Sequence, residues 1–134
     1  MHNIRFHLIF VTLLALNLGC GTNRATGPDP VPELPYYPTV KHTSYTRGSD
    51  PNQGFSKTVR AEMLTSDSYL KVGKFYAEAI EQYGWTGEVT MQPVPDKGVM
   101  KHTFNLSKGS SVAKIEIEQR DDGGANIIIE RKDK

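Results

Sequence analysis

The chain has 134 residues, of which 16 are lysine or arginine and 15 are aspartate or glutamate. Its formal net charge of +1 provides no strongly basic surface, so the composition excludes a nucleic-acid partner. The single cysteine, Cys20, excludes disulfides within the chain and metal sites built from cysteine pairs. We also expect no metal and no cofactor, because the sequence contains no motif with the spacing that either requires.

The first 19 residues are typical of a leader for export. Arg5 lies close to the start, and residues 8–18 form an apolar run. This run is too short to span a bilayer, which takes about 20 apolar residues, and it matches the central segment of a secretory signal. Cys20 follows the small residue Gly19 directly after this run.

The segment ending at Cys20 resembles a bacterial lipoprotein signal peptide. The resemblance implies cleavage between Gly19 and Cys20, and a diacylglycerol with fatty acyl chains such as palmitate on the Cys20 sulfur. Membrane lipid is then a partner, the location is the cell envelope, and Gly21 favours the outer membrane in a Gram-negative cell. An ordinary secretory signal is the alternative, but it leaves a lone thiol in an oxidising compartment.

Residues 20–38 are predicted to form a tether behind this anchor. Five of the eight prolines lie here, and proline lacks an N–H donor and favours extended backbone. Such a segment extends by about 3.1 Å per residue. A proline-rich ligand for a partner domain is the alternative, and Tyr36 and Tyr37 can dock on the domain and end the tether.

Residues 39–134 predict a small folded domain that contains six strands. Alternation of apolar and polar residues is clearest in residues 112–120, where Ala113, Ile115 and Ile117 share one face. Turn residues follow the later strands at short intervals, which indicates an antiparallel meander. The predicted strands are residues 40–47, 55–64, 87–94, 99–108, 112–120 and 125–131.

One amphipathic helix is predicted between the second and third strands. Thr65 or Ser66 can cap its start, and Gly84 ends it in the left-handed conformation. Gly73 lies on the apolar stripe and costs about 1 kcal/mol of helix propensity, which predicts a close approach to the sheet. The fold class is therefore α+β, with one helix on one face of a mainly antiparallel sheet in the order β-β-α-β-β-β-β.

Three short stretches of the helical region resemble helices in small uncharacterised bacterial envelope domains. They are Ser66-Asp67-Ser68, Phe75-Tyr76 and Tyr83-Gly84-Trp85. This resemblance implies a location in the envelope and no activity.

Catalytic motifs are not found. His42 and His102 are the histidines outside the leader, and a hydrolase would use one of them as a base. His42, Ser44 and Asp50 can be written as a triad, but the sequence has no Gly-x-Ser-x-Gly elbow. We therefore predict a non-enzymatic protein with no catalytic residue. An envelope hydrolase and an inhibitor or immunity-type protein are the alternatives.

Aromatic residues are frequent for so small a domain. Tyr37, Phe75 and Trp85 are candidates for an exposed groove that binds a glycan or a peptide. The alternative for the same residues is core packing, because each aromatic side chain buries a large apolar area. The function predicted from the sequence is a binding or assembly module whose partner is an envelope protein or a glycan.

Overall fold

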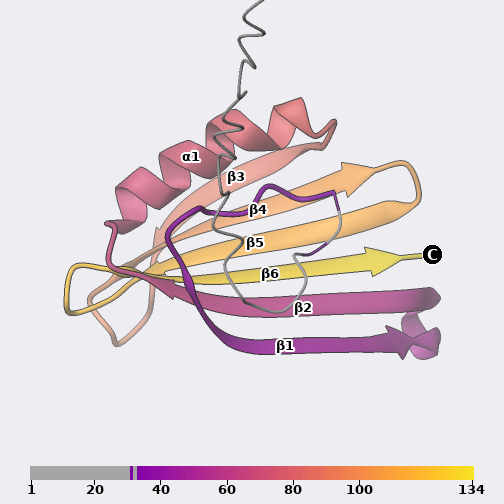
Figure 1. Ribbon diagram of the computed structural model, residues 1–134, viewed down its shortest axis with the longest axis horizontal. Coiled ribbons are helices and arrows are strands. Elements are labelled where there is room, and N and C mark those ends of the chain that lie inside the picture. The colour runs from indigo at the N-terminus through magenta and orange to yellow at the C-terminus, as the bar shows by residue number, and fades with distance from the viewer. Residues whose placement is uncertain (1–30, 32) are drawn as a thin grey trace, which may run out of the picture.

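The computed structural model describes residues 31 and 33–134. In this part of the chain, one antiparallel sheet forms a layer, and a helix lies across one face of it (Figure 1). The elements are β1 (Lys41–Asp50), a short 3-10 turn η1 (Pro51–Gln53), β2 (Phe55–Thr65), α1 (Tyr69–Gln82), β3 (Thr86–Pro93), β4 (Met100–Lys108), β5 (Ser111–Gln119) and β6 (Ala125–Asp133). The predicted fold class and element order are confirmed.

The strands are arranged in the order β1-β2-β6-β5-β4-β3, and all neighbours are antiparallel. The meander of β3 to β6 returns to the first hairpin, so that Ala61 of β2 lies opposite Ile129 of β6. This pairing joins the two halves of the chain into one sheet. It leaves β1 and β3 as the two edge strands.

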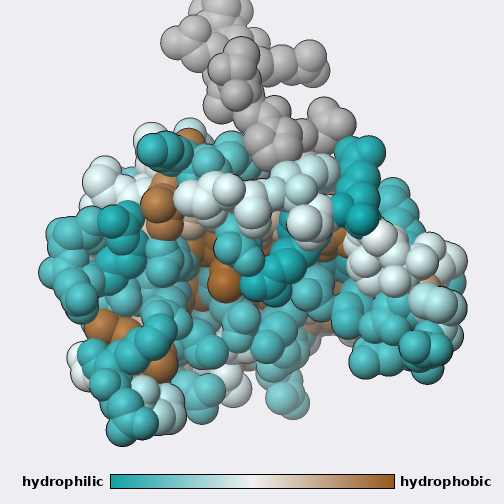
Figure 2. Space-filling model, turned by 90° about the horizontal axis from the view of Figure 1, so that it is seen from below, coloured by the Kyte–Doolittle hydropathy of each residue, from teal (hydrophilic) through white to brown (hydrophobic). Residues whose placement is uncertain are grey.

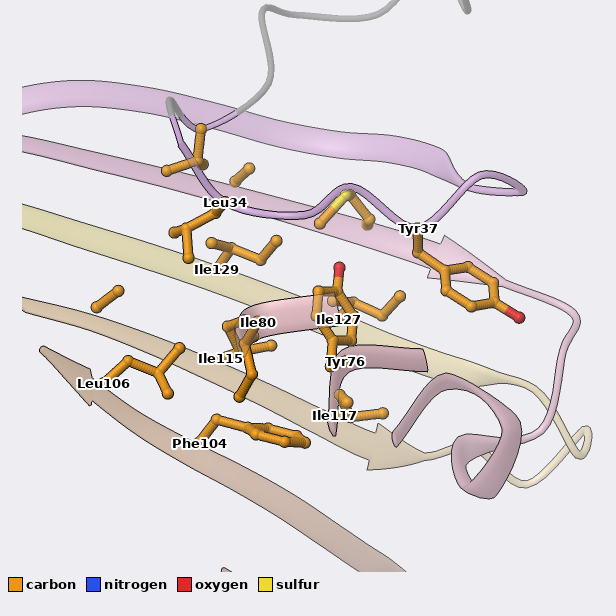
Figure 3. Packing of buried hydrophobic residues seen from close by; sticks show 14 of the residues in the cluster. Leu34, Tyr37, Tyr76, Ile80, Phe104, Leu106, Ile115, Ile117, Ile127 and Ile129 are labelled. Atoms are coloured by element: carbon orange, nitrogen blue, oxygen red, sulfur yellow. The ribbon is translucent and has the colours of Figure 1, made fainter. Parts of the chain in front are cut away.

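The core lies between the sheet and α1. Ile115 pairs with Ile129 and Ile117 pairs with Ile127, so isoleucines from β5 and β6 form one apolar patch (Figure 3). All four side chains are fully buried, and each such side chain contributes about 1.5–3 kcal/mol. The opposite face of the sheet carries ion pairs in contact with solvent, as the alternation predicted; Arg60 with Glu62 is one of them.

Helix α1 begins later than predicted. Its N-cap is Ser68, whose side-chain oxygen accepts a hydrogen bond from the Lys71 N–H at 3.4 Å. The predicted caps at positions 65 and 66 are wrong, because Thr65 still belongs to β2. Its hydroxyl instead accepts from the Asp67 N–H at 3.2 Å in the turn that precedes the helix.

Gly73 brings α1 close to the sheet, as predicted. A Cβ atom at this position would lie 2.6 Å from Cε1 of His102 on β4, and still closer to its Nδ1. Only glycine therefore fits above this histidine without a displacement. Gly84 has φ of 75°, which confirms the predicted left-handed end of the helix.

The described end of the predicted tether packs on the sheet beside α1. Val31, Leu34 and Tyr37 are buried, and Leu34 lies near Ile129 (Figure 3). A helix about 10 Å wide covers two or three strands spaced about 4.8 Å apart, whereas the apolar face extends over four strands. Residues 31 and 33–38 cover the remainder, so they belong to the folded unit rather than to a tether. Residues 20–30 and the leader lie outside the described residues.

Asp67 joins this N-terminal segment to the start of α1. The Tyr37 hydroxyl donates to its carboxylate at 2.7 Å, and the Thr39 hydroxyl donates at 3.1 Å. The Lys71 ammonium group forms an ion pair with the same carboxylate at 2.9 Å. These hydrogen bonds, above all the one from Tyr37, lower the pKa of Asp67 from 3.8 to about 2.

Asp67→Asn is expected to remove a pH-dependent part of the stability. A carboxyl group with a lowered folded-state pKa stabilises the fold above its unfolded pKa, and this contribution disappears as the pH falls through the folded pKa. The difference in unfolding free energy between wild type and Asp67→Asn should therefore shrink between about pH 5 and pH 2. Urea titrations at several pH values measure it, with the exposed Glu78→Gln as control. A difference that stays constant over this range would contradict the assignment.

Candidate functional site

Two of the three aromatic residues predicted to line an exposed groove are core residues. Trp85 is 1% exposed and Tyr37 is 3% exposed, so neither offers its ring to a ligand. Phe75 is half-buried, and its ring is edge-on to Tyr37 at 5.1 Å and to Tyr76 at 5.2 Å. Their common role is to pack α1 and the N-terminal segment onto the sheet.

The two histidines are separated and packed against aromatic rings. The His42 ring stacks on Tyr36 at 5.1 Å, and the Tyr36 hydroxyl lies 2.6 Å from its Nε2. The His102 ring lies 5.4 Å from that of Tyr69, and its buried Nδ1 has no hydrogen-bond partner among the described residues. Burial lowers the pKa of both imidazoles, which favours their neutral forms.

The triad of His42, Ser44 and Asp50 does not form. All three residues lie on the extended strand β1, where eight residue steps separate His42 from Asp50. At about 3.3 Å per step, the two side chains start roughly 26 Å apart. Asp50 instead faces Lys132, with 3.8 Å between carboxylate and ammonium.

In the turn between β5 and β6, the acidic residue Asp122 forms a hydrogen bond and an ion pair with residues of the same turn. Asp122 accepts from the Gly124 N–H at 3.0 Å and forms an ion pair with Arg120. A polar groove of about 610 Å³ lies beside this turn, and the Lys97–Glu118 ion pair, at 2.9 Å, lines it. Within the part of the chain that the structure describes, no three histidine, cysteine, aspartate or glutamate residues are grouped to hold a metal.

A second groove lies on the sheet face opposite α1, and we call it the Phe55 groove. Its volume is about 440 Å³, within the range of small-ligand sites. The outer face of β4, β5 and β6 forms the floor, and η1 with the start of β2 forms a wall. It is lined by Gln53, Phe55, Asn105, Leu106, Ser107, Val112, Ala113, Lys114, Glu130 and Lys132.

The Phe55 groove combines an aromatic ring with two ammonium groups. Lys132 Nζ lies 5.6 Å from the centroid of the Phe55 ring and 3.3 Å from the Glu130 carboxylate. Lys114 lies opposite Glu130 in the strand register, and Val112 is 37% exposed. These groups suit a ligand with an acidic group next to an apolar or ring-shaped part.

No local sequence pattern indicates this groove. Phe55 and Lys132 are 77 positions apart, and no motif connects them; the pairing of β2 with β6 brings them together. Seen from the β1 edge, the surface is largely hydrophilic, with hydrophobic atoms in small separate groups (Figure 2). Among the described residues, no helix has the length and apolar character to cross a membrane.

A family model described as START domain-like matches residues 42–124. The match covers more than half of the 134 residues; it includes β1 except for its first residue, Lys41, and every later element through β5. Comparisons with curated proteins and with solved structures found no significant match. The chain belongs to the START domain-like family.

Proposed function

We propose that this chain is a membrane-anchored lipoprotein of a bacterial cell envelope whose domain binds a ligand without catalysing a reaction. Cleavage behind Gly19 leaves Cys20 as the first residue, and acyl chains on its sulfur anchor the protein. The outer membrane is the proposed location in a Gram-negative cell. Support comes from the apolar run in residues 8–18 and the small residue before Cys20, all of which lie outside the described residues.

The observation that carries the ligand-binding part of the proposal is the Phe55 groove. It offers a cation over an aromatic ring, a second lysine and the amide groups of Gln53 and Asn105 within about 440 Å³. A START domain-like domain is consistent with a ligand-binding fold. The proposed ligand bears a carboxylate beside an apolar or ring-shaped part, as an acidic peptide of an envelope protein or an acidic glycan does.

Binding is better supported than the hydrolase alternative. The Tyr36 hydroxyl lies within hydrogen-bond distance of the His42 ring. The backbone of α1 at Gly73 packs against the His102 ring. Neither histidine lines the Phe55 groove, so a ligand bound there would not meet an imidazole base.

A photo-crosslinking amino acid in place of Val112 tests the groove in intact cells. We expect a crosslinked peptide at this position, identified by mass spectrometry, because Val112 is exposed on the groove floor. Lys132→Met should strongly reduce the product, since it removes the ammonium group but keeps the aliphatic stem over Phe55.

The matched control places the same crosslinker at Glu78, whose side chain is 67% exposed on α1. It should not give the same product. An identical crosslink from Glu78, or a Val112 crosslink unchanged by Lys132→Met, would contradict binding in the Phe55 groove.

A further inference from the structure

Strand β3 is an open edge of the sheet. All eight of its residues, Thr86–Pro93, are exposed, and within the described chain it pairs only with β4. An edge strand presents a row of unpaired N–H and C=O groups that can template pairing with another strand. The two edges of this sheet differ in how well they are protected against such pairing.

The other edge, β1, carries the usual protection. It bears the charged residues Lys41 and Arg47, and its register shifts twice, between His42 and Ser44 and between Gly48 and Asp50. Such irregularities and charges discourage pairing with a further strand. An additional strand is therefore disfavoured at β1.

Strand β3 is less protected, because it has no register shift and fewer charged residues. Its ladder with β4 runs without a register shift from Thr86 to Pro93, and Glu88 is its one charged residue. Val89 is 53% exposed and Met91 is 58% exposed. Both project toward the α1 side of the sheet, because their cross-strand partners, Phe104 and His102, contact residues of the helix.

We propose that β3 pairs with β3 of a second copy of this chain, antiparallel and centred on Thr90. In this register Val89 faces Met91 of the second copy on the helix side. Thr90 then faces its own counterpart, and Glu88 faces Gln92 of the second copy on the other side. Apolar residues thus meet apolar ones, and no carboxylate lies opposite another.

The symmetry of this pairing gives a closed dimer. A two-fold axis perpendicular to the sheet relates the copies, so both α1 helices lie on the same face of the continuous sheet. Residues 31 and 33–38 lie on that face too (Figure 1), so the segments leading to both Cys20 residues start from one side. The attachment of both chains to one membrane rests on the proposed function, that is, on the anchor at Cys20. The pairing of the two β3 strands does not depend on that anchor.

Thr90→Cys in the full-length chain, in its native membrane, tests the dimer. Residues directly opposite in an antiparallel pair have Cα atoms about 4.5–5.5 Å apart, a separation that a disulfide spans. Mild oxidation should convert most of the chain to a disulfide-linked dimer with twice the mass. The exposed Thr46→Cys on β1 is the matched control, and the wild-type chain reports any link through Cys20; neither should dimerise.

Val89→Lys, combined with Thr90→Cys, should reduce the crosslinked product to the wild-type level. Val89 is more than half exposed, so circular dichroism should show an unchanged fold. Three outcomes would overturn the proposal: no disulfide from Thr90→Cys, equal dimer from Thr46→Cys, or a disulfide to a different protein. Because this readout does not involve the Phe55 groove or acylation, it can fail while the proposed function holds.

Discussion

Trp85→Ala is expected to lower the free energy of unfolding by about 3–5 kcal/mol, the usual range for removing a fully buried large aromatic side chain. Trp85 Nε1 donates a hydrogen bond to the Glu33 carbonyl at 2.7 Å. The Arg131 guanidinium lies over its ring, 5.7 Å from the centroid, and pairs with the Glu33 carboxylate at 3.0 Å. The substitution thus removes a core side chain and releases a contact of the N-terminal segment.

Trp85→Phe separates these two effects. It keeps an aromatic ring but loses the hydrogen bond to Glu33, whose net contribution is typically about 1 kcal/mol. Urea unfolding gives both free energies, and hydrogen exchange of residues 33–37 should accelerate in both variants. If Trp85→Ala lowered the stability by less than about 1 kcal/mol, the described packing of the segment would be wrong.

Gly73→Val is expected to lower the free energy of unfolding by about 2–3 kcal/mol through overpacking. The added side chain would occupy the space of the His102 imidazole ring. The half-buried histidine ring lies beside Tyr69 and Phe104, at ring separations of 5.4 and 6.4 Å, so admitting the valine displaces it from these contacts. Thermal and urea unfolding both measure the loss.

His102→Ala should rescue Gly73→Val, because it empties the space that the valine needs. The double variant is therefore expected to be more stable than the sum of the two single losses predicts. Ala77→Val, at an exposed position of α1, is the control for the lower helix propensity of valine alone. Additive losses at positions 73 and 102 would show that the two residues are not in contact.

The local sequence pattern predicted the helix and the strands well. The period-two alternation of Ala113, Ile115 and Ile117 reflects a strand with one buried face, and the structure buries all three side chains. Gly73 and Gly84 were informative because the backbone and the helix–sheet distance leave few alternatives to glycine there. Such signals act over a few residues and can be recognised without the tertiary structure.

The described part of the predicted tether, residues 31 and 33–38, belongs to the folded unit although only the docking of Tyr36 and Tyr37 was expected, because composition does not indicate what a segment covers. Prolines favour an extended backbone, whether the chain is free or lies on a sheet. The useful signal was the width of the apolar face: one helix cannot cover four strands, so a second covering element was required. Val31 and Leu34 were the apolar residues available for it.

The Phe55 groove and the unequal edges depend on strand order. Neither could be predicted while the pairing of β2 with β6 was unknown, because Phe55 and Lys132 approach only through that pairing. Likewise, β3 is an edge because the meander joins the first hairpin through β6, so that β3 pairs only with β4 among the described strands. Contacts between residues so far apart in the sequence depend on the order of all the strands, and no local sequence pattern indicates them.

Mass spectrometry of the mature protein, purified from the membrane fraction, tests the membrane anchor most directly. The account predicts an N-terminal peptide that begins at Cys20 and carries the mass of a diacylglycerol with its acyl chains. In a Cys20→Ser variant, this modification should be absent and the chain should leave the membrane fraction with its domain folded. A peptide that still spans the Gly19–Cys20 bond, or Cys20 with an unmodified thiol, would contradict the account.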